Sequence, residues 1–184
     1  MTTQTDASWE TKTGLSRVDF ESMVKFTGLS DNPVDNRNRA IILGHSAEGI
    51  LVAPGAVIKL ADGYSIGPRC FIGLYTYISG MVTVASDVLI GPHCSITTNN
   101  HRFNPADMSF RGKNESAPIT IGRGSWLAAG VMVTAGVTIA LGTLICANAV
   151  VTRNTESLSI YAGTPAKKIG AIDPKTGDYH WSRS

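Results

Sequence analysis

The chain of 184 residues is long enough for one domain with a buried core, and its 16 lysines and arginines nearly balance its 14 aspartates and glutamates. The formal charge of +2 argues against binding to nucleic acid or a membrane surface through bulk charge. No apolar run approaches the length of a membrane span, residues 1–10 are too polar for a signal peptide, and three cysteines without a CxxC pair indicate reduced thiols. We therefore expect a cytoplasmic protein without membrane insertion.

The N-terminal segment, residues 1–49, is expected to hold a polar stretch, a short helix and a lead-in to the main domain. Ser16, followed three positions later by Asp19, is a capping pattern that predicts the start of a helix, and Gly28 predicts its end. After the helix the chain is expected to enter early coils that follow the repeat less faithfully than the later ones.

A branched apolar residue then recurs every six positions, which a helix with its spacings of three and four does not produce. The first series is Ile66, Ile72, Ile78, Val84, Ile90 and Ile96, and the second is Ile121, Leu127, Val133, Ile139, Ile145 and Val151. A small or polar residue follows each of them, and smaller side chains such as Cys70, Cys94, Ser125 and Thr143 often stand two positions before.

A period of six fits a short strand plus a turn, repeated three times in a triangular coil of about 18 residues. The sequence therefore predicts an all-β fold, a parallel β-helix of hexapeptide repeats over residues 50–172, followed by a C-terminal tail over residues 173–184. A β-sandwich with regular spacing is the alternative, and the period does not define the handedness of the helix.

The period breaks from 98 to 118, and this extended loop begins with a histidine. His101 lies 18 positions after Thr83 and 36 after Ser65, which predicts that it belongs to one outward-facing column. An imidazole there can act as general base on a hydroxyl group, although a lone surface histidine is more often without function.

A metal centre is not expected from the histidines. His93 and His101 are eight positions apart, which is not a multiple of six, so they do not share a corner of the coil. The other two, His45 and His180, fall before and after the clear repeats.

The second half of the repeats is almost free of charge. Between Ile121 and Thr152 only Arg123 is charged, which indicates a surface buried in a homo-oligomer, or else small residues that merely serve tight turns. Trp126 stands out among these small neighbours as an anchor residue. Beyond this stretch a hydroxyl and three cations, those of Thr152, Arg153, Lys167 and Lys168, could bind phosphate groups or form a solvated end.

Three segments resemble the hexapeptide-repeat acyltransferases, and most closely the maltose and galactoside O-acetyltransferases: Thr98–His101, Pro118–Leu127 and Tyr161–Ile169. The resemblance covers about residues 50–172 and implies a left-handed β-helix, a homotrimer, and acetyl-CoA as co-substrate in the groove between two prisms, with no metal.

The resemblance also implies roles for individual residues. His101 would be the catalytic base, and the acetyl-CoA site would be formed by Trp126, Ala129, Ala147, Thr152, Arg153, Lys167 and Lys168. Asn99, Tyr75 and Tyr77 are candidates for acceptor binding. Three positions depart from these families: Ala129 replaces a serine of the galactoside enzymes, Gly73 aligns near their acceptor-binding asparagine, and Gly170 replaces a basic residue near the end of the proline-containing motif.

The expected activity is acetyl transfer from acetyl-CoA to a hydroxyl of a sugar or glycan, by direct transfer with a histidine base. An N-acetyltransferase and an antibiotic O-acetyltransferase are alternatives on the same scaffold. A third is a non-catalytic β-solenoid that serves as an assembly module.

Overall fold

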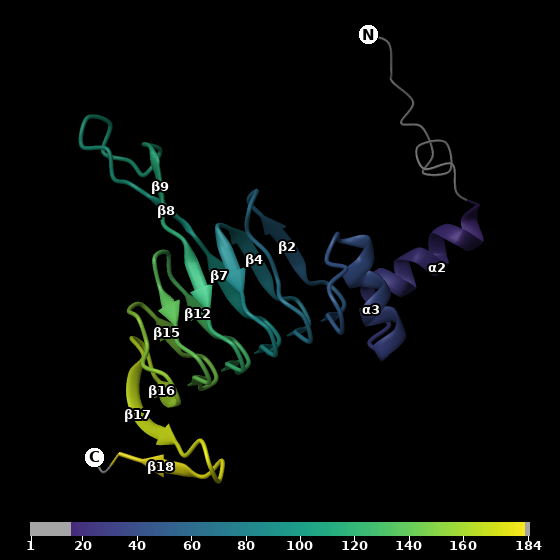
Figure 1. Ribbon diagram of the computed structural model, residues 1–184. Coiled ribbons are helices and arrows are strands. Elements are labelled where there is room, and N and C mark those ends of the chain that lie inside the picture. The colour runs from purple at the N-terminus through teal and green to yellow at the C-terminus, as the bar shows by residue number, and fades with distance from the viewer. Residues whose placement is uncertain (1–15, 183–184) are drawn as a thin grey trace.

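A three-sided parallel β-helix makes up most of the computed structural model, which describes residues 16–182 (Figure 1). The first face consists of β1 (Leu51–Val52), β3 (Phe71–Ile72), β6 (Leu89–Ile90), β11 (Trp126–Leu127), β14 (Leu144–Ile145), β16 (Ser159–Ala162), β17 (Lys167–Ile172) and β18 (Tyr179–Trp181). The second face consists of β2 (Val57–Leu60), β4 (Tyr77–Gly80), β7 (Ser95–Thr97), β12 (Met132–Val133) and β15 (Val150–Val151). The third face consists of β5 (Val82–Val84), β10 (Ile119–Ile121) and β13 (Thr138–Ile139).

The chain runs through the three faces in order, so that coils 1 to 5 begin at β1, β3, β6, β11 and β14. We call the corner line between the first and second faces edge 1, and the line between the second and third faces edge 2. The predicted all-β hexapeptide-repeat fold is confirmed, and the architecture is consistent with the left-handed form that the resemblance implies.

Two helices precede the coils in the described part of the chain. The helix α2 (Arg17–Gly28) begins where the sequence predicts, because Ser16 Oγ accepts a hydrogen bond from the Asp19 N–H. A second helix, α3 (Pro33–Ile42), was not predicted, although Asn32 caps it and a proline opens its first turn. Neither helix is long and apolar enough to cross a bilayer.

The six-residue period places the predicted aliphatic side chains inside the prism. Each of the twelve is at most 5% exposed. Ile72 pairs with Ile90 and Ile78 with Ile96, in each case 18 positions further along the chain. Because each coil bonds to the next through parallel strands, the core forms only when coils stack.

The small residues that accompany the aliphatic ones have two different tasks. Two positions before an aliphatic residue, Ser125 and Thr143 are buried, and their hydroxyl groups donate to the Ala140 carbonyl at 2.9 and 2.8 Å. One position after an aliphatic residue the backbone of the next coil is very close. A Cβ atom on Gly73 would lie 2.5 Å from the carbonyl carbon of Gly91.

Arginine side chains of α3 cap the open N-terminal end of the β-helix. Arg37 donates to the Ala47 carbonyl at 2.7 Å, and the buried Arg39 donates to the Val52 carbonyl at 3.0 Å. The Val52 carbonyl lies on the first coil and the Ala47 carbonyl just before it, at the end of the prism where no earlier coil is present. Hydrogen bonds from charged donors therefore replace the missing backbone partners.

The C-terminal end is closed by antiparallel strands. β16 pairs in parallel with β14, but β17 turns back on β16 and β18 pairs with β17. On the third face, Asn154 Oδ1 accepts from the Thr138 N–H at 2.8 Å. Both devices end the parallel stacking that a further coil would otherwise extend.

The close approach at Gly73 predicts a local cost for any side chain there. Gly73→Ala should lower the free energy of unfolding by about 1–3 kcal/mol, the usual cost of overpacking, because the neighbouring backbone cannot move aside easily. Urea denaturation at one fixed protein concentration measures this. Gly28→Ala is the matched control, since a Cβ atom there meets nothing within 4 Å. Equal stability of the two variants would contradict the packing argument.

Candidate active site

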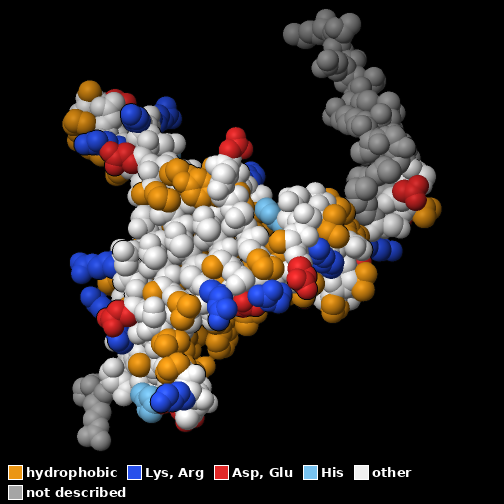
Figure 2. Space-filling model, in the orientation of Figure 1, with side chains coloured by type: hydrophobic (Ala, Val, Ile, Leu, Met, Phe, Trp, Pro, Cys, Tyr) orange, Lys and Arg blue, Asp and Glu red, His pale blue; other side chains and the backbone are white. Residues whose placement is uncertain are grey.

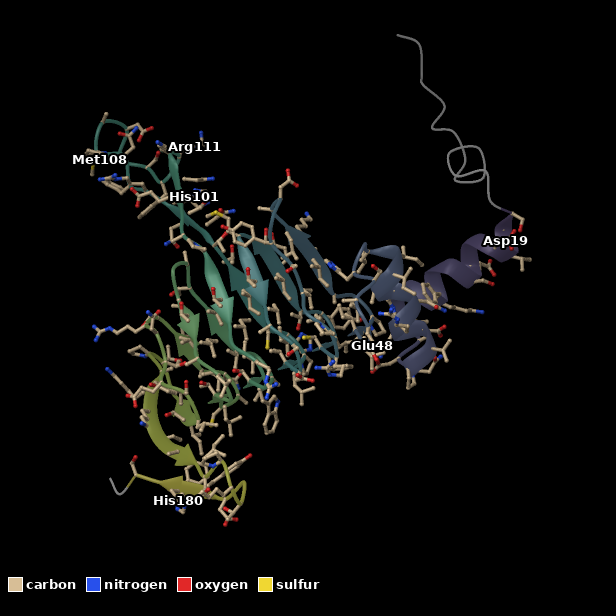
Figure 3. The ribbon with its side chains drawn as sticks, in the orientation of Figure 1. Asp19, Glu48, His101, Met108, Arg111 and His180 are labelled. Atoms are coloured by element: carbon tan, nitrogen blue, oxygen red, sulfur yellow. The ribbon has the colours of Figure 1, made fainter. Side chains whose placement is uncertain are left out.

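An arm interrupts coil 3 at edge 2 and projects away from the prism (Figures 1 and 3). Ile66 bridges to Val84, 18 positions later, whereas Val84 pairs with Ile121, 37 positions later. The difference is the arm, which leaves the stacking register on both sides intact. Its stem consists of the antiparallel strands β8 (Asn99–His101) and β9 (Asn114–Ser116).

Thr98 fixes the base of the arm to the preceding coil. This residue is fully buried, its N–H donates to the Ser79 carbonyl at 3.2 Å, and its Oγ1 accepts from the Met81 N–H at 3.1 Å. The returning strand is held as well, because the Ala117 N–H donates to the Thr98 carbonyl at 3.1 Å. The first residues of the arm therefore have a defined position relative to coil 2.

His101 lies in the stem of the arm, three residues beyond this anchor. It is exposed, pairs with Asn114 across the stem, and its imidazole has no hydrogen-bond partner among residues 16–182. Ser65 and Thr83 share the predicted column, but His101 does not belong to it, since Thr83 pairs with Thr120. The inserted chain carries His101 out of the coil, which shifts the register by the length of the arm.

Two pairs stiffen the arm around this histidine. Ser116 Oγ donates to Asn99 Oδ1 at 2.6 Å, so the predicted acceptor residue Asn99 is held beside the base of the arm. Further out, Arg102 forms an ion pair with Glu115 across the stem at 2.8 Å. The ion pair is exposed and therefore contributes little to stability, but it ties the two strands together beyond His101.

Other predicted residues lie at edge 1. Ala129 and Ala147 are exposed and occupy equivalent positions in coils 4 and 5, where the Asn148 N–H donates to the Ala129 carbonyl at 2.9 Å. Tyr75 lies on the same edge in coil 2, and its ring stacks on that of His93 with centroids 5.5 Å apart. Edge 1 is thus lined by small residues in later coils and by aromatic rings in earlier ones.

Trp126 and Tyr77 lie on faces rather than edges. Trp126 is 46% exposed and stands on the first face, paired with Leu89 and Leu144 on either side. Tyr77 stands on the second face, between Val57 and Ser95.

A single chain does not bring these residues together with His101. Edges 1 and 2 are the two borders of the second face, and the chain crosses it in the five residue steps from His93 to Thr98. At ~3.3 Å per residue the two edges are about 17 Å apart. Within one protomer, the candidate base and the residues of edge 1 are therefore on opposite sides of one sheet.

The predicted phosphate-binding residues lie beyond the last coils. Thr152, Arg153, Lys167 and Lys168 are all exposed. Lys168 forms an ion pair with Glu156 at 2.6 Å, and this contact raises the pKa of the lysine. Glu156 was not predicted as part of this site, because its distance of twelve positions from Lys168 gives no signal until β17 folds back.

The cysteines offer no activated nucleophile. Cys70 and Cys94 are buried, and burial raises the pKa of both thiols. Burial raises the pKa of the Cys146 thiol in the same way. Because the thiolate is the reactive form, this environment favours protonated, unreactive side chains.

Comparison with known proteins gives the family, although no family model matches the chain. The chain is 30% identical to the galactoside O-acetyltransferase of Escherichia coli over 163 residues, which cover 86% of this chain and 80% of that protein. Its fold is similar to that of a maltose O-acetyltransferase from Clostridium difficile, with a TM-score of 0.64, 21% identity, and coverage of 85% of this chain and 86% of that one.

A second similar fold is that of an N-acyltransferase. The N-acyltransferase AntD of Bacillus cereus, in complex with dTDP-4-amino-4,6-dideoxyglucose and coenzyme A, matches with a TM-score of 0.62 and 16% identity, over 70% of this chain and 73% of that one. At this identity the similarity shows the fold alone. The galactoside O-acetyltransferase, by contrast, is similar in sequence over most of both chains, and the protein described here belongs to the hexapeptide-repeat acetyltransferases.

Proposed function

We propose that the protein transfers an acetyl group from acetyl-CoA to a hydroxyl of a sugar or glycan, with His101 as general base. The observation that carries this proposal is the exposed imidazole on an arm anchored at edge 2, in a chain related to a galactoside O-acetyltransferase. His101 takes the proton of the acceptor hydroxyl as its oxygen attacks the thioester carbonyl. When the C–S bond breaks, the imidazolium returns this proton to the CoA thiolate.

A backbone amide at edge 1 supports the stabilisation of the tetrahedral intermediate. The Ala129 N–H has no acceptor among the described residues, and this position lacks the serine hydroxyl of the galactoside enzymes. Such an N–H can donate to the oxyanion. Direct transfer also agrees with the protonated, buried cysteines, which are poor candidates for an acyl-enzyme.

The active site is proposed to form between subunits of a homotrimer. In a threefold ring with the second face turned to the axis, edge 2 of each chain meets edge 1 of the next. His101 would then approach the partner's Ala129 and the partner's Tyr75. Figure 2 shows the second face toward the viewer, with few charged side chains across its middle, and its outward residues include the exposed Val57, Tyr77 and Met132.

A charge on the second face tests this assembly. Met132→Asp should dissociate the trimer and remove activity together, because Met132 is 49% exposed on the face proposed to be buried. Thr138→Asp, on the exposed third face, is the control and should stay trimeric. Sedimentation velocity at micromolar concentration measures both. A monomeric wild-type protein, or a trimeric Met132→Asp variant, would rule out this arrangement.

The general base is tested by removing the imidazole. His101→Ala should lower kcat by about 10²–10⁴-fold, the usual contribution of a general base, while the trimer and the KM for acetyl-CoA change little. Thiol release from acetyl-CoA with a panel of sugars measures the rate. His101→Asn keeps a hydrogen-bonding group but cannot take the proton, so it should not restore kcat.

The control for this experiment is His180→Ala, because His180 is an exposed histidine on β18 at the other end of the molecule (Figure 3). Wild-type kcat in His101→Ala would disprove the mechanism and leave the fold assignment untouched.

The nucleotide end of acetyl-CoA is proposed to lie at the cations beyond coil 5. Replacing Lys167 and Lys168 by alanine should raise the KM for acetyl-CoA several-fold with kcat nearly unchanged, the pattern expected when uniform binding is lost. Glu156→Gln frees Lys168 from its ion pair and should lower this KM instead. Steady-state kinetics at low and high salt measure both effects, since salt screens exposed charges. A collapse of kcat in the lysine variant would contradict the assignment.

Transfer to an amine is the second candidate, and the fold similarity to AntD supports it. The same base would then remove a proton from an ammonium group or from the attacking amine. Amino sugars in the acceptor panel, followed by treatment of the product with hydroxylamine, which cleaves an ester and leaves an amide intact, distinguish the two.

A further inference from the structure

A polar cavity lies at edge 2 on the N-terminal side of the arm. Its volume is about 410 Å³, and it is formed between the loop after α3 and the loop after β2. The polar side chains of its lining come from His45, Ser46, Asp62, Tyr64 and Ser65. In Figure 1 the loop after β2 and the arm rise from the same border of the prism, separated only by coil 2.

The lining suits a neutral polyhydroxyl ligand. The carboxylate of Asp62 can accept hydrogen bonds from two hydroxyl groups. No lysine or arginine belongs to the described lining. Burial lowers the pKa of His45, which favours the neutral imidazole, a group that both donates and accepts. Tyr64 adds an aromatic ring and a hydroxyl. An anion would meet the carboxylate without a compensating cation.

Along the axis of the prism, the cavity lies on the side of His101 that is not assigned to acetyl-CoA. The residues proposed to bind acetyl-CoA belong to coils 4 and 5 and to the segment beyond them. His101 belongs to the arm, which projects from coil 3. The acceptor must therefore approach from coils 1 to 3. The cavity lies at coil 1, two coils below the arm, and at ~4.8 Å per coil this is about 10 Å from the arm base.

The surface between the cavity and the base of the arm carries only small or half-buried side chains. Edge 2 of coil 2 is formed by Gly80 and the half-buried Met81, so no large exposed side chain separates the cavity from the base of the arm. Two coils at ~4.8 Å each give a spacing of about 10 Å, which two linked pyranose rings can bridge.

We propose that this cavity is a second sugar subsite, and that the acceptor is a neutral glycoside of at least two residues rather than a free monosaccharide. One ring presents its hydroxyl to His101, and the next ring binds between Asp62 and Tyr64. The inference rests on the proposed function and goes further, since it assigns the length and charge of the acceptor to residues outside the catalytic machinery.

Acceptor length is the direct test. Methyl glucoside and methyl galactoside are compared with maltose, cellobiose and lactose in the thiol-release assay. The wild-type enzyme should show a KM about tenfold or more lower for its preferred disaccharide than for the matching methyl glycoside, at similar kcat, because hydrogen bonds to a charged group add affinity. Equal KM values for the two lengths would overturn the proposal.

The variant Asp62→Asn makes the test specific to the cavity. It should remove the advantage of the disaccharide and leave kcat and the KM of the methyl glycoside unchanged. Asp178→Asn, the same substitution at an exposed carboxylate after the coils, is the control and should behave as wild type. The proposal fails if the two variants show the same disaccharide KM.

A binding measurement separates this inference from the proposed reaction. Addition of the disaccharides should shift the NMR signals of the His45 imidazole, and Asp62→Asn should weaken this shift, whether or not the sugar is acetylated. Turnover without such a shift and without length dependence refutes the subsite alone. A shift without any turnover refutes the proposed reaction and supports the subsite.

Discussion

Parallel pairing between successive coils is the interaction on which the rest of this structure depends. Each parallel strand of the prism takes its hydrogen bonds from a strand 16 to 20 positions away, except where the arm raises this distance to 37. The pairing brings coils so close that Gly73 has no room for a side chain. The tight corners of the coils also require unusual backbone angles. Tyr75 and His93 have positive φ values of 54° and 58°, and their rings stack on each other.

The same pairing gives each residue a fixed position in the prism, defined by its edge or face and by the number of its coil. An insertion at a corner does not disturb this scheme, as the arm shows by entering and leaving at Thr98 and Ala117. Chemistry placed on such a scaffold is therefore precise in one direction along the prism. Because the coils are rigidly stacked, two groups that lie two coils apart have a fixed spacing. That spacing can select a substrate by its length.

The faces create a different constraint, because opposite borders of one sheet never meet. The candidate base lies on the arm at edge 2, while Ala129 and Ala147, proposed as part of the acetyl-CoA site, lie on edge 1. The proposed assembly about the second face would resolve this separation, and the low charge of that face supports its proposed burial. In this arrangement the open ends of the β-helix remain outside the assembly contact, and each chain caps its own, with Arg37 and Arg39 at one end and antiparallel strands at the other.

The sequence by itself determined the repeat, the inward aliphatic residues and the first helix, since all of these follow from spacing over a few residues. It also marked the loop with His101 through the break in the period. It did not predict α3, although Asn32 and Pro33 mark the start of this helix. Nor did it predict the partner of Lys168, because Glu156 comes near only when β17 reverses. The placement of His101 in the column of Ser65 and Thr83 was wrong for a related reason. The period predicts neighbours from sequence spacing alone, whereas the actual neighbours are the residues that pair by backbone hydrogen bonds. After the arm, Thr120 and not His101 pairs with Thr83. Only the tertiary structure decided which edge carries each group, because that depends on where an insertion leaves the coil and where it returns.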